Sequence, residues 1–528
     1  MAFWGGSAAV TAGVLLHLPM FVSARTDSYH LAGMKLDGWM IAGMALILAG
    51  FAAVFYGLAP RLSRLSGCTG AHLTVKALDE APLRPAHYWL MAVLTVAIAV
   101  DTLKPFTFTF ILPGVAKEYG LKSPAHPIPG ALPVALLPLL GITGTVIGSF
   151  LWGFLADRIG RRASILLASI IFIGTSICGF MPAFGWHLVM CFVMGLGAGG
   201  LLPIAYSLLT ETIPARHRGA SVVLVAGIGT ASGFLLASGA ANWLVGNFSW
   251  RIMWSLGLPT GLILILLNRF IPESPRYLLA NGFEADAREV MQRFGVRVVA
   301  DEGVSELELE VQKTHGFSQL LRAPFGGVTL ALVLYGLGWG LVNFGFIVWL
   351  PIKLGALGLT TGHVTTILAK AALFSLPGAF VVSWLYGRWS SKYTMILVAI
   401  LSVVTLLVFA AEGDSIATHT GLLTFLVVAL LMSLWGVISV LAPYSAEVYP
   451  TKVRATGAGI AAGASKLGGV VALTMAVASI APPSIAGAAV LTAAPMLLSA
   501  VVLGVTGVET RARRLEEISV MELASVAE

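Results

Sequence analysis

The chain has 528 residues, of which 57% are hydrophobic and only 11% are charged, and its mean hydropathy is +0.90. Such values exclude an ordinary soluble surface, so lipid must be the main solvent around this chain. A net charge of +7 would suit a nucleic-acid binder, but the basic residues are divided among segments between apolar runs. We therefore expect contact with membrane lipids and no nucleic acid.

Apolar runs long enough to cross a bilayer recur along the whole sequence. An α-helix needs about 18 or more apolar residues to cross roughly 30 Å of hydrocarbon, whereas barrel strands are short and alternate in polarity. No such alternation is present. The predicted fold class is an all-α membrane protein with two pseudo-symmetric six-helix bundles and two extra N-terminal transmembrane helices.

The extra helices are expected near 6–23 and 38–60, within a first region 1–60. A basic stretch, 61–86, follows as a cytoplasmic linker. The tripeptide Val22–Ala24 resembles a signal-peptide cleavage site, but no Lys or Arg precedes the apolar run. We expect the first segment to be retained as a helix, and cleavage remains the alternative.

The two bundles are expected over 87–271 and 326–508. Spans of the first bundle are predicted near 87–112, 131–156, 163–183, 187–210, 220–244 and 249–271. Spans of the second are predicted near 326–351, 363–386, 393–411, 419–443, 455–480 and 484–506. The cytoplasmic loop 272–325 contains EADAREVMQRF and SELELEVQK, whose periodicity indicates short amphipathic helices outside the membrane. A polar cytoplasmic tail, 509–528, follows.

The distribution of Lys and Arg predicts the orientation, because positive loops are retained on the cytoplasmic side. The basic loops contain Arg61, Arg64, Lys76, Arg84, Arg158, Arg161, Arg162, Arg216, Arg218, Arg388, Lys392, Lys452, Arg454, Arg511, Arg513 and Arg514. The opposite loops contain only Arg25, Lys35, Lys117, Lys122, Arg251 and Lys353. We expect a multi-pass protein of the cell inner membrane, with both ends of the bundle in the cytoplasm.

An internal repeat relates the two bundles. ETIPARHRGA and EVYPTKVRATG each follow the fourth span of their half and share the spacing E-x-x-P-x-x-x-R. The matching residues are Glu211, Pro214 and Arg218 in the first half and Glu447, Pro450 and Arg454 in the second. Duplicated halves imply a pseudo-two-fold axis along the membrane normal and a solute site between them. The repeat predicts a transporter.

Over about residues 87–508 the chain resembles the major facilitator superfamily. GFLADRIGRR (Gly153–Arg162) matches the loop after the family's second helix, and PESPRYLLANG (Pro272–Gly282) is similar to the sugar-porter and metabolite:proton symporter branches. The resemblance implies alternating access and a cytoplasmic gate that closes when the site faces outward. The gate residues expected from it are Gly153, Asp157, Arg158, Gly160, Arg161, Arg162, Glu211, Arg218, Glu273, Arg276, Glu447 and Arg454.

The residue types of the gate loop also suit a gate on physical grounds, independently of the resemblance. Asp157 is predicted at a helix end, where a carboxylate can accept hydrogen bonds from free N–H groups at the start of a neighbouring helix. The three arginines of the loop supply partners for Glu211. Retention of positive charge in the cytoplasm would explain the arginines alone, but neither Asp157 nor Gly160. The second-half counterpart has Gly387 at the position of Asp157, so we expect an asymmetric gate in which Lys392 joins Glu447.

Ionisable residues at membrane depth are functional candidates, because each costs about 2.5–3.5 kcal/mol on insertion scales. Asp101 and Lys104 lie one turn apart in the first bundle helix, and Pro105 follows as an expected helix break. Lys370 lies in the eighth helix and Lys466 in the eleventh. Both lysines are candidates to line the cavity. For Lys370, the alternative is that its stem extends to the membrane interface.

Polar and aromatic residues of the second half complete the expected site. Asn343, Trp339 and Trp435 are candidates for its lining, with plain packing as the alternative for the two indoles. The predicted substrate-binding residues are therefore Lys104, Asn343, Lys370, Lys466, Trp339 and Trp435, and Asp101 is the predicted proton-coupling residue. One carboxylate against three amines leaves positive charge that a negative solute would balance.

These residues predict a secondary active transporter that takes up a small organic anion or carboxylate with a proton. A sugar transporter, proton-coupled or facilitative, is one alternative, although the fifth and seventh helices contain no Gln. A transport-inactive sensor or scaffold on the same fold is another. No Walker loop, metal-ligand cluster or Ser/His/Asp arrangement indicates an enzyme. We expect no cofactor and no metal, with a small-molecule solute and protons as partners of a monomer.

Overall fold

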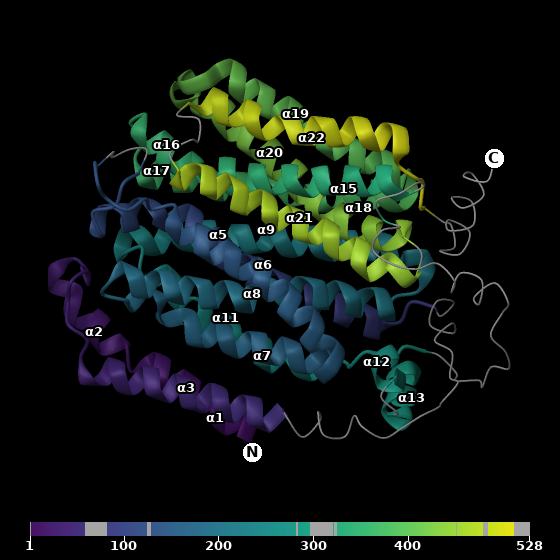
Figure 1. The fold of residues 1–528 in the computed structure, drawn as a ribbon, viewed down its shortest axis with the longest axis horizontal. Coiled ribbons are helices and arrows are strands. Elements are labelled where there is room, and N and C mark those ends of the chain that lie inside the picture. Colours follow the sequence, from purple (N-terminus) through teal and green to yellow (C-terminus); the bar gives the residue numbers. More distant parts are fainter. Residues whose placement is uncertain are drawn as a thin grey trace.

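A computed structural model describes residues 2–58, 82–123, 128–280, 283–295, 320, 325–449, 451–478 and 484–511. Within these ranges the protein is all-α, as predicted. Fourteen helices of the described part are long and apolar enough to cross a membrane, which is the number that the sequence predicted. Figure 1 shows the long helices side by side and nearly parallel, with α12 and α13 beyond one end of the bundle.

The two extra helices form a tightly packed hairpin. Helix α1 (Ala2–Leu15) is followed by the short α2 (Leu18–Ser23), and α3 (Gly38–Leu58) returns along α1. A Cβ atom on Gly6 of α1 would lie 2.7 Å from the carbonyl oxygen of Gly50, so the two backbones touch. The hairpin packs against α7, on the side of the first half that lies away from the second half (Figure 1).

The first half contains six spans. They are α5 (Pro85–Glu118), α6 (Leu136–Ile159), α7 (Arg161–Gly174) with η3 (Thr175–Phe180), α8 (Phe184–Thr212), α9 (Ala215–Asn247), and α10 (Ile252–Ser255) with α11 (Gly257–Leu267) and η4 (Asn268–Phe270). The expected helix break at Pro105 is wrong, because α5 continues through this residue to Glu118. Packing of α5 against α9, α8 and α11 supports the helix around the proline.

The segment between the halves carries short helices at one end of the bundle. Helices α12 (Pro275–Ala280) and α13 (Glu284–Arg293) pack together through Leu278 and Ala287. Helix α13 confirms the amphipathic helix expected in EADAREVMQRF. The second expected helix, in SELELEVQK, lies outside the described residues.

The second half also contains six spans. They are α15 (Phe325–Gly340) with the π-helical η7 (Leu341–Ile347) and α16 (Leu350–Ala356), α17 (Thr361–Ser375) with α18 (Pro377–Arg388), α19 (Ser391–Glu412) with η8 (Gly413–Thr418), α20 (Thr420–Val448), α21 (Thr451–Val477) and α22 (Ile485–Thr506). The π-helical turn is a frequent feature of functional sites, and it contains Asn343.

The halves meet along two pairs of helices. Helix α9 packs against α17 and α18, and α6 packs against α21. Near one end of the first pair, Ser383 donates to the carbonyl of Ala220 at 2.8 Å. Near the other end, Thr366 donates to the side-chain oxygen of Asn242 at 2.9 Å. The middle of the second pair contains the charged residue Lys466.

Candidate solute site and gates

Lys466 reaches from the second half into the first. Its amine, on α21, donates to the hydroxyl of Ser149 on α6 and, at 3.2 Å, to the carbonyl of Gly199 on α8. Ser149 donates to the same carbonyl at 2.7 Å. An ammonium group from one half therefore lies against two helices of the other half, at the boundary between the halves.

Asp101 is the acidic group of this region. It lies on α5 with 2% of its surface exposed, and its electrostatic partner is Lys466. Tyr206 on α8 is close enough to interact with Asp101 as well. Among the described residues, neither Oδ1 of Asp101 nor the hydroxyl of Tyr206 has a hydrogen-bond partner. Buried polar atoms are rarely left in this state, so these two are candidates to bind a solute or a proton.

A pair of aromatic side chains also lies at the boundary between the halves. The ring of Trp435 on α20 lies 5.9 Å from that of Phe234 on α9, so this contact crosses between the halves. Within the described part of the chain, the indole N–H of Trp435 and the amide of Asn343 have unused donors. The indole N–H of Trp339 donates to the carbonyl of Leu434 at 3.0 Å, so its hydrogen bond serves packing between helices.

Lys104 does not lie in this group, so the expectation that it shares a chamber with Asp101 is wrong. A Cβ atom on Gly257 of α11 would collide with the Lys104 amine and with the hydroxyl of Ser176 in η3. The Lys104 amine thus lies toward the third and sixth spans. Three residues advance a helix by about 300°, so the side chains of Asp101 and Lys104 point in directions about 60° apart around α5. The long stem of Lys104 then carries its amine away from Asp101.

Lys370 is also outside the site. It is exposed on α17, and Phe374, one turn further along the same face, is 64% exposed. An exposed phenylalanine next to the lysine identifies this face of the helix as the lipid-facing one. This exposure favours the interfacial alternative for Lys370 over a place in the lining of the cavity.

The gate loop of the first half forms a compact polar cluster. Arg161 and Glu211 form an ion pair at 3.3 Å, and Glu211 also accepts a short hydrogen bond from the hydroxyl of Ser274. Glu273 accepts the backbone N–H of Arg161 at 2.7 Å, at the start of α7. Burial raises the pKa of Glu273, and the backbone N–H groups of Ser274, Arg161 and Arg162 offset only part of this effect.

Other predicted members of the gate have different roles. Gly160 has a φ of 94°, which only glycine adopts readily, and a Cβ atom there would lie 3.1 Å from the ring of Tyr277. The guanidinium of Arg158 lies 3.9 Å over the ring of Phe154 instead of on Glu211. Gly153 is exposed on α6, with open space around it. The side chains of Asp157, Arg276 and Arg454 lie outside the described residues.

Glu447 connects the gate of the second half to the first half. It accepts hydrogen bonds from Tyr386 and Thr510, each at 2.7 Å, and Arg218 is its electrostatic partner across the boundary. A Cβ atom on Gly219 would lie 2.8 Å from the Glu447 carboxylate. The expectation that Lys392 joins Glu447 is wrong within the described residues, where the partners of Glu447 are Tyr386, Thr510 and Arg218. The sequence analysis missed Thr510 and its neighbour Glu509.

Glu509 repeats in the second half what Glu273 does in the first. It accepts the backbone N–H of Ser391 at 2.9 Å, at the start of α19, and also the hydroxyls of Ser390 and Ser391. Burial alone would raise the pKa of Glu509, but these hydrogen bonds hold it below its usual range. Each half therefore has a carboxylate, located after its sixth span, at the N-terminus of its third span.

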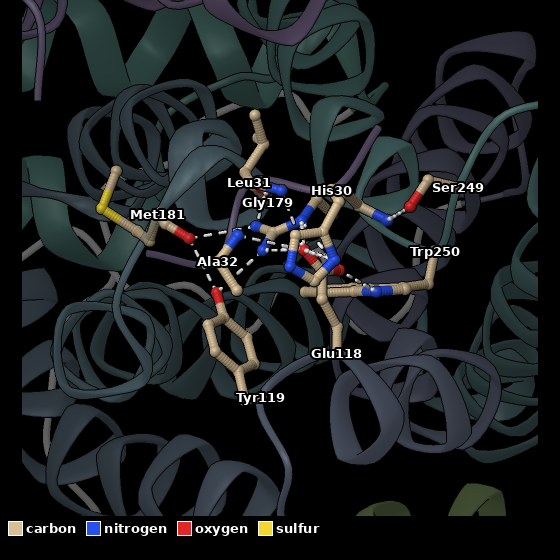
Figure 2. A network of polar contacts seen from close by, with 10 residues as sticks. His30, Leu31, Ala32, Glu118, Tyr119, Gly179, Met181, Ser249 and Trp250 are labelled. Carbon is tan, nitrogen blue, oxygen red and sulfur yellow. Dashed lines mark hydrogen bonds and ion pairs between the residues drawn. The ribbon is translucent and has the colours of Figure 1, made fainter. Parts of the chain in front are cut away.

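A buried ion pair at the opposite end of the bundle was also missed (Figure 2). Glu118, at the end of α5, accepts from Arg251 at 2.6 Å, from the indole of Trp250 at 2.8 Å and from the backbone N–H of Leu31 at 2.9 Å. Arg251 also donates to the carbonyl of Gly179. The network ties the hairpin loop to the first half. Its one sequence signal is an arginine beside a tryptophan in a loop otherwise poor in basic residues.

Comparisons with known proteins agree with this architecture. Residues 90–473 match the family described as the Major Facilitator Superfamily. The niacin transporter NiaP of Acinetobacter baylyi is 28% identical, covering 84% of this chain and 99% of its own length. The 4-hydroxybenzoate transporter PcaK of the same organism is 27% identical, covering 74% of this chain and 85% of its own length.

A solved structure shows the same fold. The proton:xylose symporter XylE, bound to 6-bromo-6-deoxy-D-glucose, is similar with a TM-score of 0.67 at 18% identity, covering 83% of this chain and 99% of the symporter. With the family match over most of the chain, this likeness accounts for the two six-helix halves and their repeat. The chain therefore belongs to the Major Facilitator Superfamily, as a multi-pass membrane transporter of small organic solutes and not an enzyme.

Proposed function

We propose that this protein takes up an organic carboxylate together with a proton, with Lys466 as the solute-binding cation and Asp101 as the proton-binding group. The observation that carries the proposal is the placement of these two residues. Lys466 belongs to the second half and Asp101 to the first, and they interact electrostatically at the boundary that must open and close. Any ligand that changes this pairing changes the contact between the halves.

Charge balance supplies the coupling. When Asp101 is ionised, its charge compensates that of Lys466, and the site can reorient empty without a net buried charge. Protonation of Asp101 removes this compensation, and the carboxylate of the solute then restores it at Lys466. Proton and monocarboxylate therefore enter together, and the transport step is electroneutral.

Aromatic side chains narrow the class of solute. The rings of Trp435 and Phe234 lie near the boundary between the halves, and the Trp435 indole keeps an unused donor among the described residues. Stacking on such rings favours a flat solute. The relatives named for niacin, 4-hydroxybenzoate and gallate carry names of aromatic carboxylic acids. An aromatic monocarboxylate is the solute class that we propose.

The gate completes the cycle. The contact of Glu447 with Arg218 and Gly219 joins the two halves at the end of the bundle with the basic loops. We place this end in the cytoplasm, since positive loops are retained there. The contact must then break whenever the site opens inward. One chain contains every element of the cycle, so the functional unit is a monomer in the cell inner membrane.

Transport into proteoliposomes tests the proposal. With an alkaline interior, the wild type accumulates labelled nicotinate or 4-hydroxybenzoate, and Asp101→Asn loses accumulation but keeps counterflow of the solute. Lys466→Ala loses both, and the lipid-facing Lys370→Ala serves as the matched control that keeps both. Uptake by Asp101→Asn that equals the wild type at every pH would refute the coupling scheme. Counterflow of xylose or glucose but of no acid would identify a sugar transporter instead, and binding without counterflow a sensor.

A further inference from the structure

A cavity of about 500 Å³ lies between the extra hairpin and the first half. The hairpin contributes Phe3 and Trp4 of α1 and Gly57 and Leu58 of α3. The first half contributes residues at the start of α7, namely Arg162, Ala163 and Leu166, and residues at the end of the sixth span, namely Ile265, Leu266, Asn268 and Arg269. This volume is in the range of small-molecule sites, and the walls are mostly apolar.

The cavity is located at the boundary of the membrane. The spans Gly38–Leu58, Arg161–Phe180 and Ile252–Phe270 each begin or end at its lining, at the end of the bundle with the basic loops. Trp4 is 63% exposed and Leu266 is 67% exposed, so the cavity is open toward the surrounding acyl chains. Tryptophan is enriched at this level of a bilayer. A ligand with an apolar part can therefore enter from the lipid phase.

The polar part of the lining has a definite chemistry. Arg162 and Arg269 both belong to the lining, and the guanidinium of Arg269 also lies 4.6 Å over the ring of Phe270. Two guanidinium groups suit a single phosphate anion. Asn268 has 5% of its surface exposed, and its side-chain oxygen is buried without a hydrogen-bond partner in the described part of the chain. An unpartnered amide oxygen accepts a hydrogen bond, so a ligand that carries a donor beside its anion suits this site.

We propose that the cavity binds one anionic phospholipid whose headgroup carries a free hydroxyl, of the phosphatidylglycerol type. The phosphate lies with Arg162 and Arg269, the headgroup hydroxyl donates to Asn268, and the acyl chains lie along Leu266 and Trp4. A zwitterionic headgroup fits less well, because its ammonium would stand next to two guanidinium groups. The lipid joins the extra hairpin to the first half, which gives the two additional helices a role in building the site.

Native mass spectrometry of the full-length protein in detergent tests the site. The probes are palmitoyl-oleoyl phosphatidylglycerol, phosphatidylethanolamine with the same acyl chains, and inorganic phosphate. The wild type retains one phosphatidylglycerol more tightly than phosphatidylethanolamine. Arg269→Gln weakens this binding about fivefold, the effect of about 1 kcal/mol for one basic residue at an anionic lipid surface, while Arg269→Lys retains it. Asn268→Ala reduces the preference for phosphatidylglycerol.

The matched control is Arg216→Gln, which removes an exposed arginine at the start of α9, outside the cavity lining. It leaves binding unchanged. Equal retention of the two lipids by the wild type would overturn the proposal, as would equal losses in Arg269→Gln and Arg216→Gln. An unchanged preference in Asn268→Ala would overturn the assignment of the hydroxyl, and displacement of the lipid by inorganic phosphate would identify a phosphate site instead.

Discussion

Removal of the Glu118 carboxylate tests how much its buried ion pair with Arg251 contributes to stability at the end of the bundle whose loops contain few basic residues. In Glu118→Ala, Arg251 keeps its carbonyl partners at Gly179 and Met181 but loses its counter-ion, and its side chain is 0% exposed. Breaking a buried ion pair from one side costs about 3–5 kcal/mol. Because two carbonyl bonds remain, we expect the lower end, a loss of about 3 kcal/mol in the free energy of unfolding.

The assay is unfolding in detergent, followed by intrinsic fluorescence. Glu118→Ala lowers the unfolding midpoint by several degrees, whereas Arg288→Ala, which breaks the exposed pair with Glu284 at 3.8 Å, changes it little. The double variant Glu118→Leu/Arg251→Met recovers most of the loss, because neither charge is then buried alone. Equal midpoints for Glu118→Ala and Arg288→Ala would refute the reasoning, and so would a double variant no more stable than the single one.

Two further predictions concern the gate region. Gly160→Ala destabilises the protein by about 1–3 kcal/mol, because φ is 94° and the new Cβ meets Glu273 and Tyr277, whereas Gly153→Ala, in open space on α6, is neutral or slightly stabilising; equal unfolding midpoints would contradict this. The lowered pKa of Glu509 means that its carboxylate stabilises the fold above the ordinary glutamate range near 4.5, a contribution lost as pH falls through the lowered pKa. Unfolding midpoints measured between neutral and acidic pH should therefore fall less steeply in Glu509→Gln, and parallel curves would exclude the linkage.

Much of the fold follows from local properties of the sequence. The length of an apolar run determines whether a helix can cross the bilayer, so the fourteen spans could be counted without a structure. The charge of Lys466 within an apolar span was also sufficient to mark it as a candidate. Conversely, Pro105 was overestimated as a helix breaker, because packing by neighbouring helices supports the backbone around it.

The site was less predictable, because it depends on side-chain direction and on segments that are distant in the sequence. A small angular offset on α5 was sufficient to separate Lys104 from Asp101. The ion pair of Glu118 with Arg251 requires three loops to converge, and no single segment carries its pattern. Glu509 could not be predicted for another reason. The pairs Glu273–Ser274 and Glu509–Thr510 make equivalent contacts after the sixth span of each half, but the sequences around them differ, so the repeat was not recognisable.

The hairpin of α1 and α3, whose backbones touch at glycines, makes the first half wider than the second in the plane of the membrane. Because α1 and α3 pack on α7, the first half together with the hairpin contains eight candidate membrane spans in the described part of the chain, and the second half contains six. Tilting the wider first half would change the thickness of the bilayer around more helices than tilting the second half, so it would cost more free energy. In the cycle proposed above, we therefore expect the second half to rotate while the first half stays nearly upright.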